Sequence, residues 1–504
     1  MPAAPVPVTE HIARLREDPL TANPDGWHVD WDDGPWPVKV HTGGRRIAVG
    51  AGDPELDRLG GLLFHTFGVS RVRFDPRGGL PPTPDRPVPA HHGPRFVTRR
   101  PIPSGGAMYP TEAYVLLPAR REVHHYDPYR HELVDLSRPC SGARLRAVLD
   151  VPALPSVVLV LANRFWKNFY KYGDFAFRLG AVDVGVALGR AVRLAAAEYG
   201  HVDVHTEFAD AELNGLLGVD GTGESAYAVV AFGPPASEPA EQAGDGLGRP
   251  TVLERSRLIK TSDLFDAMHA ASCVRTTPQP IPEDQPAPDD GRVVELPAVA
   301  RVDLLDRQKM LRRTSNGMLF NGEPASALEL ATVLRHTTDA LAALRQVGGD
   351  PATADVELHC AVHRTAAIPS GWYRYRPGTH DLIAVGAGTV DDSARVLQNA
   401  LFAESVNIEL AAFTVHVTGW RDHRRRGRGT RGYREQQLVV GAAVEAVTLS
   451  AHAVGLGSHP VLGFDVNVVD PAYGLAAHGR GAHAQISVGA VRPDPNWEVA
   501  VMPR

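Results

Sequence analysis

Two stretches of the chain, FRLGAVDVGVALGRAVRLAAAEYG (residues 177–200) and YREQQLVVGAAVEAVTLSAHAVG (residues 433–455), follow one pattern. Arg178 in the first aligns with Arg434 in the second, and Gly185 aligns with Gly441. Both stretches are helical in character and almost apolar all round, so each is expected to be buried against another helix. The pattern predicts two similar halves whose long helices pair with each other.

A second repeat lies before each of these helices. The segment HHYDPYRHELVDL (residues 124–136) matches WYRYRPGTHDLIAV (residues 372–385), and each predicts two short strands around a turn that contains proline. Further strands are expected in HVDVHTEF, AYAVVAFG and AHAQISVGAV. The order of elements is mixed α+β twice over, so we expect a tandem duplicated fold that forms an intramolecular pseudodimer.

The boundaries of the two halves follow from composition. Residues 233–250 and 276–292 are rich in proline, glycine and acidic side chains, and they bracket an amphipathic segment, residues 253–274, that is expected to be helical. This pattern divides the chain into four parts: an N-terminal segment (1–44), a first half (45–235), a linker with a short helix (236–296) and a second half (297–504).

The composition excludes several classes of protein. The chain has 504 residues, 43% of them hydrophobic, and a net charge of −6, which favours neither nucleic acid nor an anionic membrane as a partner. The first residues do not have the pattern of a signal peptide and no apolar run is long enough to span a bilayer, so a cytoplasmic protein is expected. The three cysteines are isolated, which predicts neither disulfides nor a metal site.

Four motifs carry candidate chemistry, and each has a plainer alternative. In PSGGAMYP (residues 103–110) two glycines allow a flat ligand to approach the backbone before a helix resumes, although a simple turn has the same composition. RRTSNG (residues 312–317) offers guanidinium and hydroxyl groups to a phosphate, or an exposed helix cap. GLGSHPVLGFD (residues 455–465) indicates a helix end followed by a loop.

The fourth motif is the pair Lys171 and Tyr172, directly before the first long helix and among several aromatic residues. Desolvation in such surroundings would lower the pKa of the lysine and make it a usable base near neutral pH. The alternative is an exposed lysine beside a packing tyrosine.

In this order and spacing, the motifs resemble the nitroreductase superfamily, and above all the SagB/McbC-type azoline dehydrogenases of pathways that make thiazole- and oxazole-containing peptides. The resemblance covers residues 45–233 and 302–504. It implies one flavin mononucleotide (FMN) between the two halves. The second half would supply phosphate, flavin-loop and C-terminal contacts, namely Arg312, Arg313, Ser315, Pro460, Val461, Leu462, Gly463 and Arg492. The first half would supply the PSGG loop, Pro103, Ser104, Gly105 and Gly106, and the catalytic residues Lys171 and Tyr172.

The reciprocal site lacks these motifs. The second half has Gly427 and Arg428 in place of the Lys-Tyr pair, and GGDPATADVE (residues 348–357) in place of PSGG. The first half has HVDVHTEF (residues 201–208) in place of the flavin loop. We therefore expect one FMN per chain. RRTSNGMLF is longer than the family spacing, so Thr314 and Ser315 both stay open as the phosphate ligand.

The resemblance implies oxidation of a thiazoline or oxazoline in a ribosomally made peptide. Lys171 or Tyr172 would remove the proton at the former Cα, hydride would pass to the flavin, and dioxygen would reoxidise it. The implied partners are the azoline-containing precursor peptide and, as a further candidate, the pathway cyclodehydratase; association into a larger homo-oligomer stays open. The alternatives are an NAD(P)H-dependent nitroreductase-like flavin reductase and a flavin-free pseudoenzyme that binds the precursor peptide. The basic run at residues 420–434 would bind an acidic leader peptide or partner, or form a solvated loop.

Overall fold

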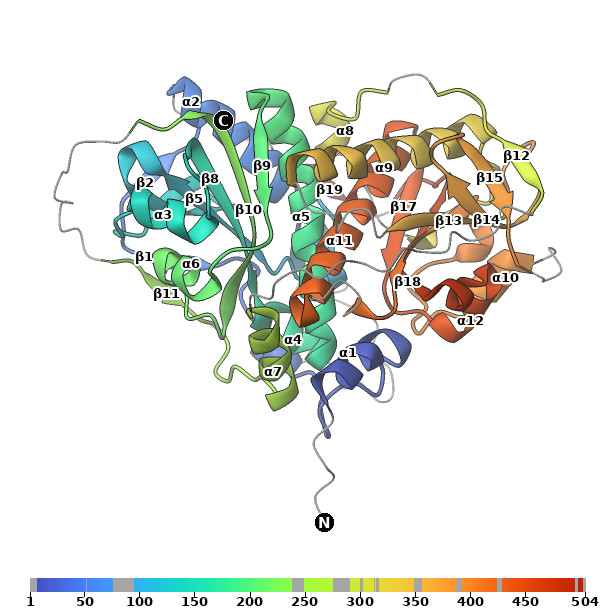
Figure 1. Cartoon of the computed structure of the whole chain (residues 1–504), viewed down its shortest axis with the longest axis horizontal. Helices are drawn as coiled ribbons and strands as arrows, with labels where there is room; N and C mark the ends of the chain where they lie inside the picture. Colours follow the sequence, from blue (N-terminus) through green and yellow to red (C-terminus); the bar gives the residue numbers. More distant parts are fainter. Residues whose placement is uncertain are drawn as a thin grey trace, which may run out of the picture.

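Two halves of mixed helix and sheet lie side by side, with a pair of long helices between them (Figure 1). The computed structural model describes residues 7–50, 52–75, 95–237, 249–274, 291–299, 302–311, 313, 317–348, 356–386, 392–423, 428–494 and 497–501. Within these ranges, no helix has both the length and the apolar character that crossing a membrane requires.

Each half is built on a seven-stranded antiparallel sheet, and the two sheets have the same strand order. In order across the first sheet, the strands are β2 (Arg46–Ala48), β7 (Glu132–Asp135), β6 (Glu122–Asp127), β5 (Thr111–Leu117), β8 (Pro155–Arg164), β10 (Glu224–Pro235) and β9 (Val202–His205). In the second they are β12 (Val293–Glu295), β15 (Asp381–Ala384), β14 (Gly371–Arg376), β13 (Glu357–Val362), β16 (Phe413–Trp420), β18 (Arg480–Gly489) and β17 (Gly457–Val461). The strands correspond one to one, which confirms the duplicated α+β fold.

The predicted hairpin repeat is reproduced in its side chains. In the first half the Tyr126 hydroxyl lies 2.8 Å from His131 Nδ1, and in the second the Tyr375 hydroxyl lies 2.7 Å from His380 Nδ1. Both histidines have a left-handed backbone, with φ of 55° and 56°. The two turns therefore share a conformation and an internal hydrogen bond, as well as a sequence pattern.

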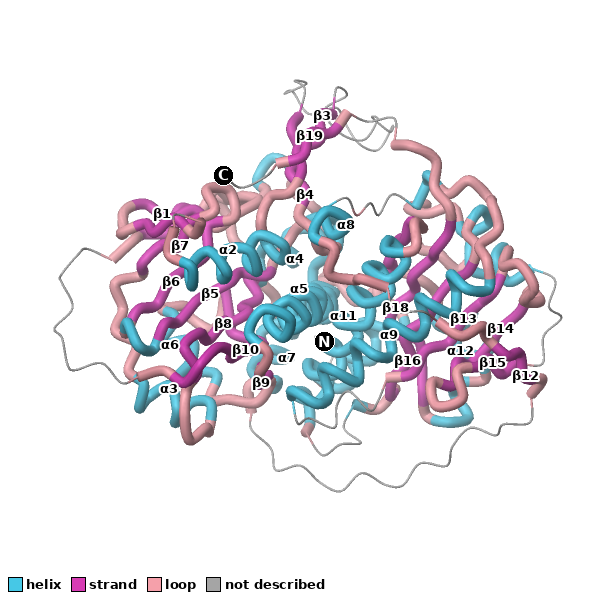
Figure 2. The backbone as a smooth tube through the Cα atoms, turned by 90° about the horizontal axis from the view of Figure 1, so that it is seen from above, coloured by secondary structure: helices cyan, strands magenta, loops and turns pink. Residues whose placement is uncertain are grey.

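The long helices α5 (Ala176–Tyr199) and α11 (Gly429–Ala453) pack against each other at the centre of the molecule (Figure 2). A Cβ on Gly185 would collide with the carbonyl oxygen of Leu438, and a Cβ on Gly441 with that of Val182. Only glycine lets two helix backbones approach so closely, and the two contacts mirror each other. The predicted pairing of the helices is confirmed.

Shorter helices surround this frame. Their bounds are α1 (Val8–Glu17), α2 (Pro54–Phe67), α3 (Gly142–Leu149), α4 (Phe165–Tyr172), α6 (Asp210–Leu217), α7 (Asp263–Ser272), α8 (Arg307–Leu311), α9 (Ala327–Gly348), α10 (Ser393–Asn399) and α12 (Val466–Tyr473). Their starts follow ordinary capping chemistry. Asp53, for example, accepts hydrogen bonds from the first backbone N–H groups of α2, and Pro54 occupies its first position.

The segments outside the two halves tie them together. On α1, Arg16 pairs with Asp470 of the second half at 2.9 Å, and His11 lies 2.9 Å from Asp174 of the first half. At the other end of the chain, β19 (Glu498–Ala500) pairs with β3 (Arg71–Asp75), which also pairs with β4 (Arg95–Arg99) (Figure 2). The end of the second half thus lies on the first.

Three local predictions were wrong. In the segment 253–274 only α7 is helical, because the side chain of Asp33 accepts hydrogen bonds from the backbone N–H groups of Arg257 and Leu258 and so removes the need for helical ones. The PSGG stretch continues into a single 3-10 turn (Gly105–Ala107) and then strand β5, not a helix. The stretch 455–465 contains edge strand β17, which pairs with β18.

Candidate active site

Lys171 and Tyr172 form the end of α4, which follows strand β8 directly. The aromatic side chains of Phe165, Trp166 and Phe169 are buried and fix this short helix against the core. Lys171 and Tyr172 are half-buried. The pair therefore lies at the boundary between the packed interior and solvent.

The PSGG loop lies directly against this pair. Gly106 is exposed and has a left-handed backbone, with φ of 57°. A Cβ placed on it would be 2.8 Å from Lys171 Nζ and would collide with the Tyr172 hydroxyl. A Cβ on Gly105 would be 2.6 Å from Leu179. Both glycines are therefore required for the loop to reach the Lys-Tyr pair, and the structure brings together all the first-half residues predicted from sequence.

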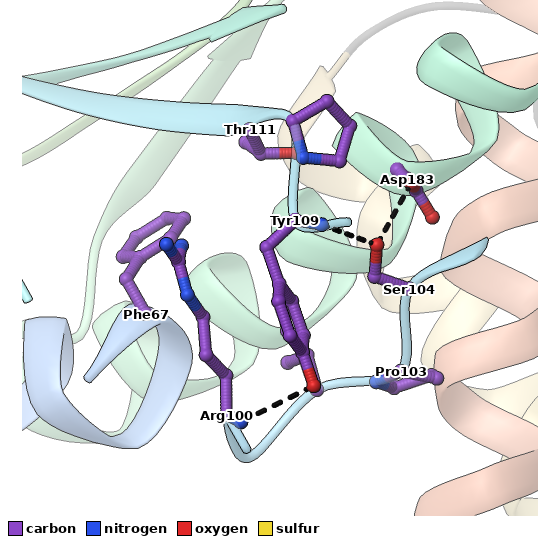
Figure 3. Close-up of a pocket in the computed structure, with 9 residues that line it drawn as sticks. Phe67, Arg100, Pro103, Ser104, Tyr109, Thr111 and Asp183 are labelled. Atoms are coloured by element: carbon purple, nitrogen blue, oxygen red, sulfur yellow. Dashed lines mark hydrogen bonds between the residues drawn. The ribbon is translucent and has the colours of Figure 1, made fainter. Parts of the chain in front are cut away.

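Asp183 holds this loop, although the motifs did not point to it. Ser104 Oγ donates to Asp183 Oδ2 at 3.0 Å (Figure 3). The Gly105 N–H donates to Oδ1 at 3.0 Å, and the Asn168 amide donates to Oδ2 at 3.2 Å. Ser104 Oγ in turn accepts the Tyr109 N–H at 2.8 Å. The sequence signal for this role is a carboxylate in the middle of the small and apolar stretch GAVDVGVALG of α5.

Burial sets the protonation of this cluster. It raises the pKa of Asp183 to about 6, against the opposing effect of the three hydrogen bonds. Burial, followed by the charge of Asp183, raises the pKa of Tyr172 well above its usual value. One turn before Lys171, burial lowers the pKa of Lys167 to about 7, and its Nζ donates to the Pro37 carbonyl at 2.7 Å. Tyr172 therefore stays a neutral phenol near neutral pH.

A small pocket opens beside the loop (Figure 3). It is lined by Phe67, Arg100, Ile102, Pro103, Ser104, Tyr109, Pro110, Thr111 and Asp183. Its walls come from α2, from the loop, from the start of β5 and from α5. The loop thus has a partly open space on the side of Asp183.

The second half reaches the loop through Arg313, which is buried. Its Nε donates to the Pro101 carbonyl at 2.8 Å and its Nη2 to the Ile102 carbonyl at 3.1 Å, just before Pro103. Its Nη1 has no hydrogen-bond partner among the residues that the structure describes. Burial lowers the pKa of Arg313 to about 10, so the side chain stays charged.

The other second-half residues gather around the segment that follows Arg313. The Gly317 N–H donates to His459 Nδ1 at 3.2 Å, which joins this segment to β17 and hence to Pro460 and Val461. Leu462 and Gly463 follow β17, and Arg492 donates to the carbonyls of Leu319 and Met318 at 2.9 and 3.3 Å. Arg312, Thr314 and Ser315 lie outside the described residues.

The reciprocal position is occupied by two ion pairs of Arg428, one to the first half and one within the second. Arg428, the counterpart of Tyr172, pairs with Glu207 at 3.5 Å and with Glu435 at 3.0 Å. Glu207 is the counterpart of Gly463, as the matching registers of β9 and β17 show. Gly427 and residues 349–355 lie outside the described part of the chain.

The basic run is not simply a solvated loop. Arg431 and Arg434, near its end, are fully buried and both pair with Asp210. Arg431 also donates to the Thr206 carbonyl at 3.0 Å. For these two arginines the expectation of a solvated loop was wrong, because an inter-half carboxylate compensates their charge. Residues 424–427 are outside the described ranges.

Comparisons with known proteins support this fold. Residues 329–490 match the model of the Nitroreductase family. A nitroreductase candidate from Anabaena variabilis superposes with a TM-score of 0.73 at 20% identity, covering 96% of this chain and 99% of that chain. A second, from Ralstonia eutropha, gives a TM-score of 0.33 at 15% identity, covering 44% of this chain and 100% of its own.

The E. coli microcin synthetase McbBCD complex with a truncated precursor bound also matches, with a TM-score of 0.29 at 16% identity over 36% of this chain and 70% of that chain. A likeness this low has no bearing on function. No curated protein matches the chain. Within the second half, residues 329–490 thus match the Nitroreductase family model, and the whole chain has a duplicated nitroreductase-like fold.

Proposed function

We propose that this protein oxidises thiazoline or oxazoline rings in a ribosomally made peptide to the corresponding azoles, with FMN as cofactor. The observation that carries the proposal is the contact of Lys171 Nζ and the Tyr172 hydroxyl with the exposed backbone of Gly106. It puts a candidate base and a hydrogen-bond donor beside a flat surface without side chains. A planar ring can lie there within reach of both groups.

The residues fit FMN, which proteins of the nitroreductase family typically bind. Gly106 has no side chain to separate the exposed loop from Lys171 and Tyr172, and one buried guanidinium nitrogen of Arg313 has no hydrogen-bond partner among the described residues, which suits it to an anion. Under this proposal Arg312, Arg313 and Ser315 hold the phosphate, and the PSGG loop, residues 460–463 and Arg492 surround the rest. When bound, FMN would supply the hydride acceptor.

The raised pKa of Tyr172 suggests different roles for the two residues of the catalytic pair. Because the pKa of Tyr172 is raised, its phenol donates a hydrogen bond and does not accept a proton at neutral pH. Lys171 is then the member of the pair that removes the acidic proton of the ring. Asp183 acts through Ser104 and Gly105, which it keeps in place beside Lys171.

One FMN per chain is part of the proposal. The ion pairs of Arg428 with Glu207 and Glu435 occupy the reciprocal position, where a base would have to face a flavin loop. At the described positions, the ion-paired Arg428 stands where the first half has Tyr172, and Glu207 stands where the second half has Gly463. A measured ratio of two flavins per chain would contradict this view.

The experiment uses the purified full chain with bound FMN and a synthetic peptide that contains one thiazoline. We expect the peptide to lose two hydrogen atoms by mass, and Lys171→Ala to keep its FMN while turnover falls by at least about 100-fold. Lys309→Ala, which removes an exposed lysine on α8, is the matched control. Full activity of Lys171→Ala would remove Lys171 from the mechanism.

The same preparation separates the alternatives. Rapid bleaching of the flavin by NADPH without peptide oxidation would indicate a nitroreductase-like flavin reductase. A colourless protein that cannot be reconstituted with FMN but binds the peptide would indicate a pseudoenzyme.

A further inference from the structure

We propose that Trp31, in the N-terminal segment, determines specificity by contacting the peptide residue next to the azoline, and that it favours an aromatic or large apolar neighbour. This inference rests on the proposed function, because it names part of the substrate of that site. Trp31 belongs to neither seven-stranded sheet, and no motif of the sequence singled it out.

Trp31 lies close to Lys171 and to the exposed Gly106. The centre of the Trp31 ring lies 6.0 Å from Lys171 Nζ, at the outer limit of a cation–π contact. The same Nζ lies against Gly106. Gly106 is exposed, and 48% of Trp31 is exposed. A ring that reaches Lys171 from solvent and rests on Gly106 therefore brings its neighbouring residue within reach of the indole.

Trp31 is held in place by its neighbours. Its ring meets Tyr170 of α4 edge-on, with centroids 6.1 Å apart. Asp30 accepts the Asp32 N–H at 3.1 Å, which caps the 3-10 turn Trp31–Asp33. The buried carboxylate of Asp33 accepts the backbone N–H groups of Arg257 and Leu258 at 2.7 and 3.0 Å. An exposed indole on a turn fixed by hydrogen bonds is preorganised for binding, since little side-chain freedom is left to lose.

The surface around Trp31 favours an apolar contact with the peptide. The exposed charges near Trp31 are of both signs, Asp30 and Asp32 on its own turn and Arg255 and Arg257 on the neighbouring segment. They nearly cancel, so the surface offers no net charge to a strongly acidic or basic peptide. The indole face is the distinctive group, and tryptophan is enriched among the residues that contribute most to binding energy at interfaces.

The test compares two synthetic thiazoline peptides that differ only in the residue next to the ring, phenylalanine or glycine. For the wild-type protein we expect a higher kcat/KM with phenylalanine, mainly through a lower KM. Trp31→Ala should reduce the ratio of the two kcat/KM values by about tenfold, and Trp31→Phe should restore most of it. Trp36→Ala is the matched control, because Trp36 is 41% exposed on the same segment but lies under Arg255. A ratio that changes equally in the Trp31→Ala and Trp36→Ala variants would overturn the inference.

Binding separates this inference from the proposed function. The two corresponding thiazole peptides, labelled with a fluorophore, are titrated with FMN-loaded protein and followed by anisotropy. If the wild type oxidises neither peptide, the proposed function fails, but a phenylalanine preference in binding that Trp31→Ala abolishes would still support a role for Trp31 in peptide recognition. If Trp31→Ala leaves the binding preference unchanged and raises the KM for NADPH instead, the indole serves a nicotinamide ring and the inference is wrong.

Discussion

The two halves share one frame but differ in what they place on it. The first half has Tyr172 beside an exposed glycine, whereas the second has Arg428 at the same position, paired with Glu207 and Glu435. Asp183, which holds the PSGG loop, corresponds on α11 to Val439, which is buried in the core. The loop and the carboxylate that fixes it are thus present together in one half and absent together at the described positions of the other. The duplication has kept the fold and let one set of site residues diverge.

The two sheets also carry different buried residues at matching positions. Val160 of β8 lies between Tyr114 and Val229 in the first sheet. At the matching place in the second sheet His416 lies between His359 and Gln485. The His416 ring also lies 2.9 Å from the Tyr473 hydroxyl. At the two positions next to Tyr114 the first sheet therefore has valines, whereas the second sheet continues as a buried polar ladder through His416 and Gln485, which should make this part of the second sheet sensitive to acid.

The largest effect is expected at the contact between α5 and α11. Substitutions on each helix test whether the stability of the fold depends equally on both sides of this interface. Gly185→Val and Gly441→Val each put a side chain onto a backbone carbonyl of the facing helix, so each should lower the free energy of unfolding by more than about 3 kcal/mol. Gly215→Ala, on α6, adds a methyl group with 3.6 Å of clearance and should change stability little. Urea denaturation measures all three. If only one of the two valine variants were destabilised, the interface would not be symmetric.

The second prediction tests the asymmetry of the site. Asp183→Asn presents an amide to three donors that now point at a carboxylate, so the PSGG loop should lose its anchor. We expect turnover of the thiazoline peptide to fall by about 10- to 100-fold, with weaker retention of FMN. Val439→Ala at the matching position should cost roughly 1–3 kcal/mol of stability by leaving a cavity, while kcat/KM stays unchanged. Equal losses of activity in both variants would show that Asp183 is merely structural.

Sequence patterns predicted the parts of this molecule that depend on local order. The paired helices and both Tyr-His hairpins could be recognised because each repeat carries its own periodicity and turn chemistry. Residues 254–262 have helical spacing, but Asp33, distant in the chain, accepts the backbone N–H groups of Arg257 and Leu258, and spacing alone contains no sign of this. The contacts of Asp183 with the loop and of Trp31 with Lys171 likewise depend on tertiary packing.

The third prediction uses the polar ladder of the second sheet. Burial lowers the pKa of His416 to about 4 and that of His363 to about 3, from an ordinary value near 6.5. The unfolded chain therefore binds more protons than the folded one below pH 6.5, so these groups stabilise the fold fully above that pH and lose this contribution as the pH falls toward 4. Between pH 6.5 and 4.5, protonation of each of these two histidines in the unfolded chain should lower the free energy of unfolding by on the order of 2–3 kcal/mol.

The check is a series of urea denaturations from pH 7 to 4.5. His416→Val introduces the first-half residue at this position and should flatten the fall in stability with acid, even though it also lowers stability at pH 7 by leaving Gln485 without its partner. An unchanged pH slope would mean that His416 does not titrate in this range.

The smallest effect is expected at the reciprocal position, where Arg428 is held in ion pairs. Arg428 is paired with Glu435, whose side chain is buried, and with the more exposed Glu207. Glu207→Ala should therefore cost at most about 1 kcal/mol, because its ion pair with Arg428 is partly screened by solvent. It should leave one FMN per chain and the same kcat/KM, since opening this position restores neither a base nor a glycine loop. Flavin absorbance against protein concentration, together with turnover, measures both. A second bound flavin in this variant would mean that a single ion pair, and not the divergence of the whole loop, keeps the reciprocal site shut.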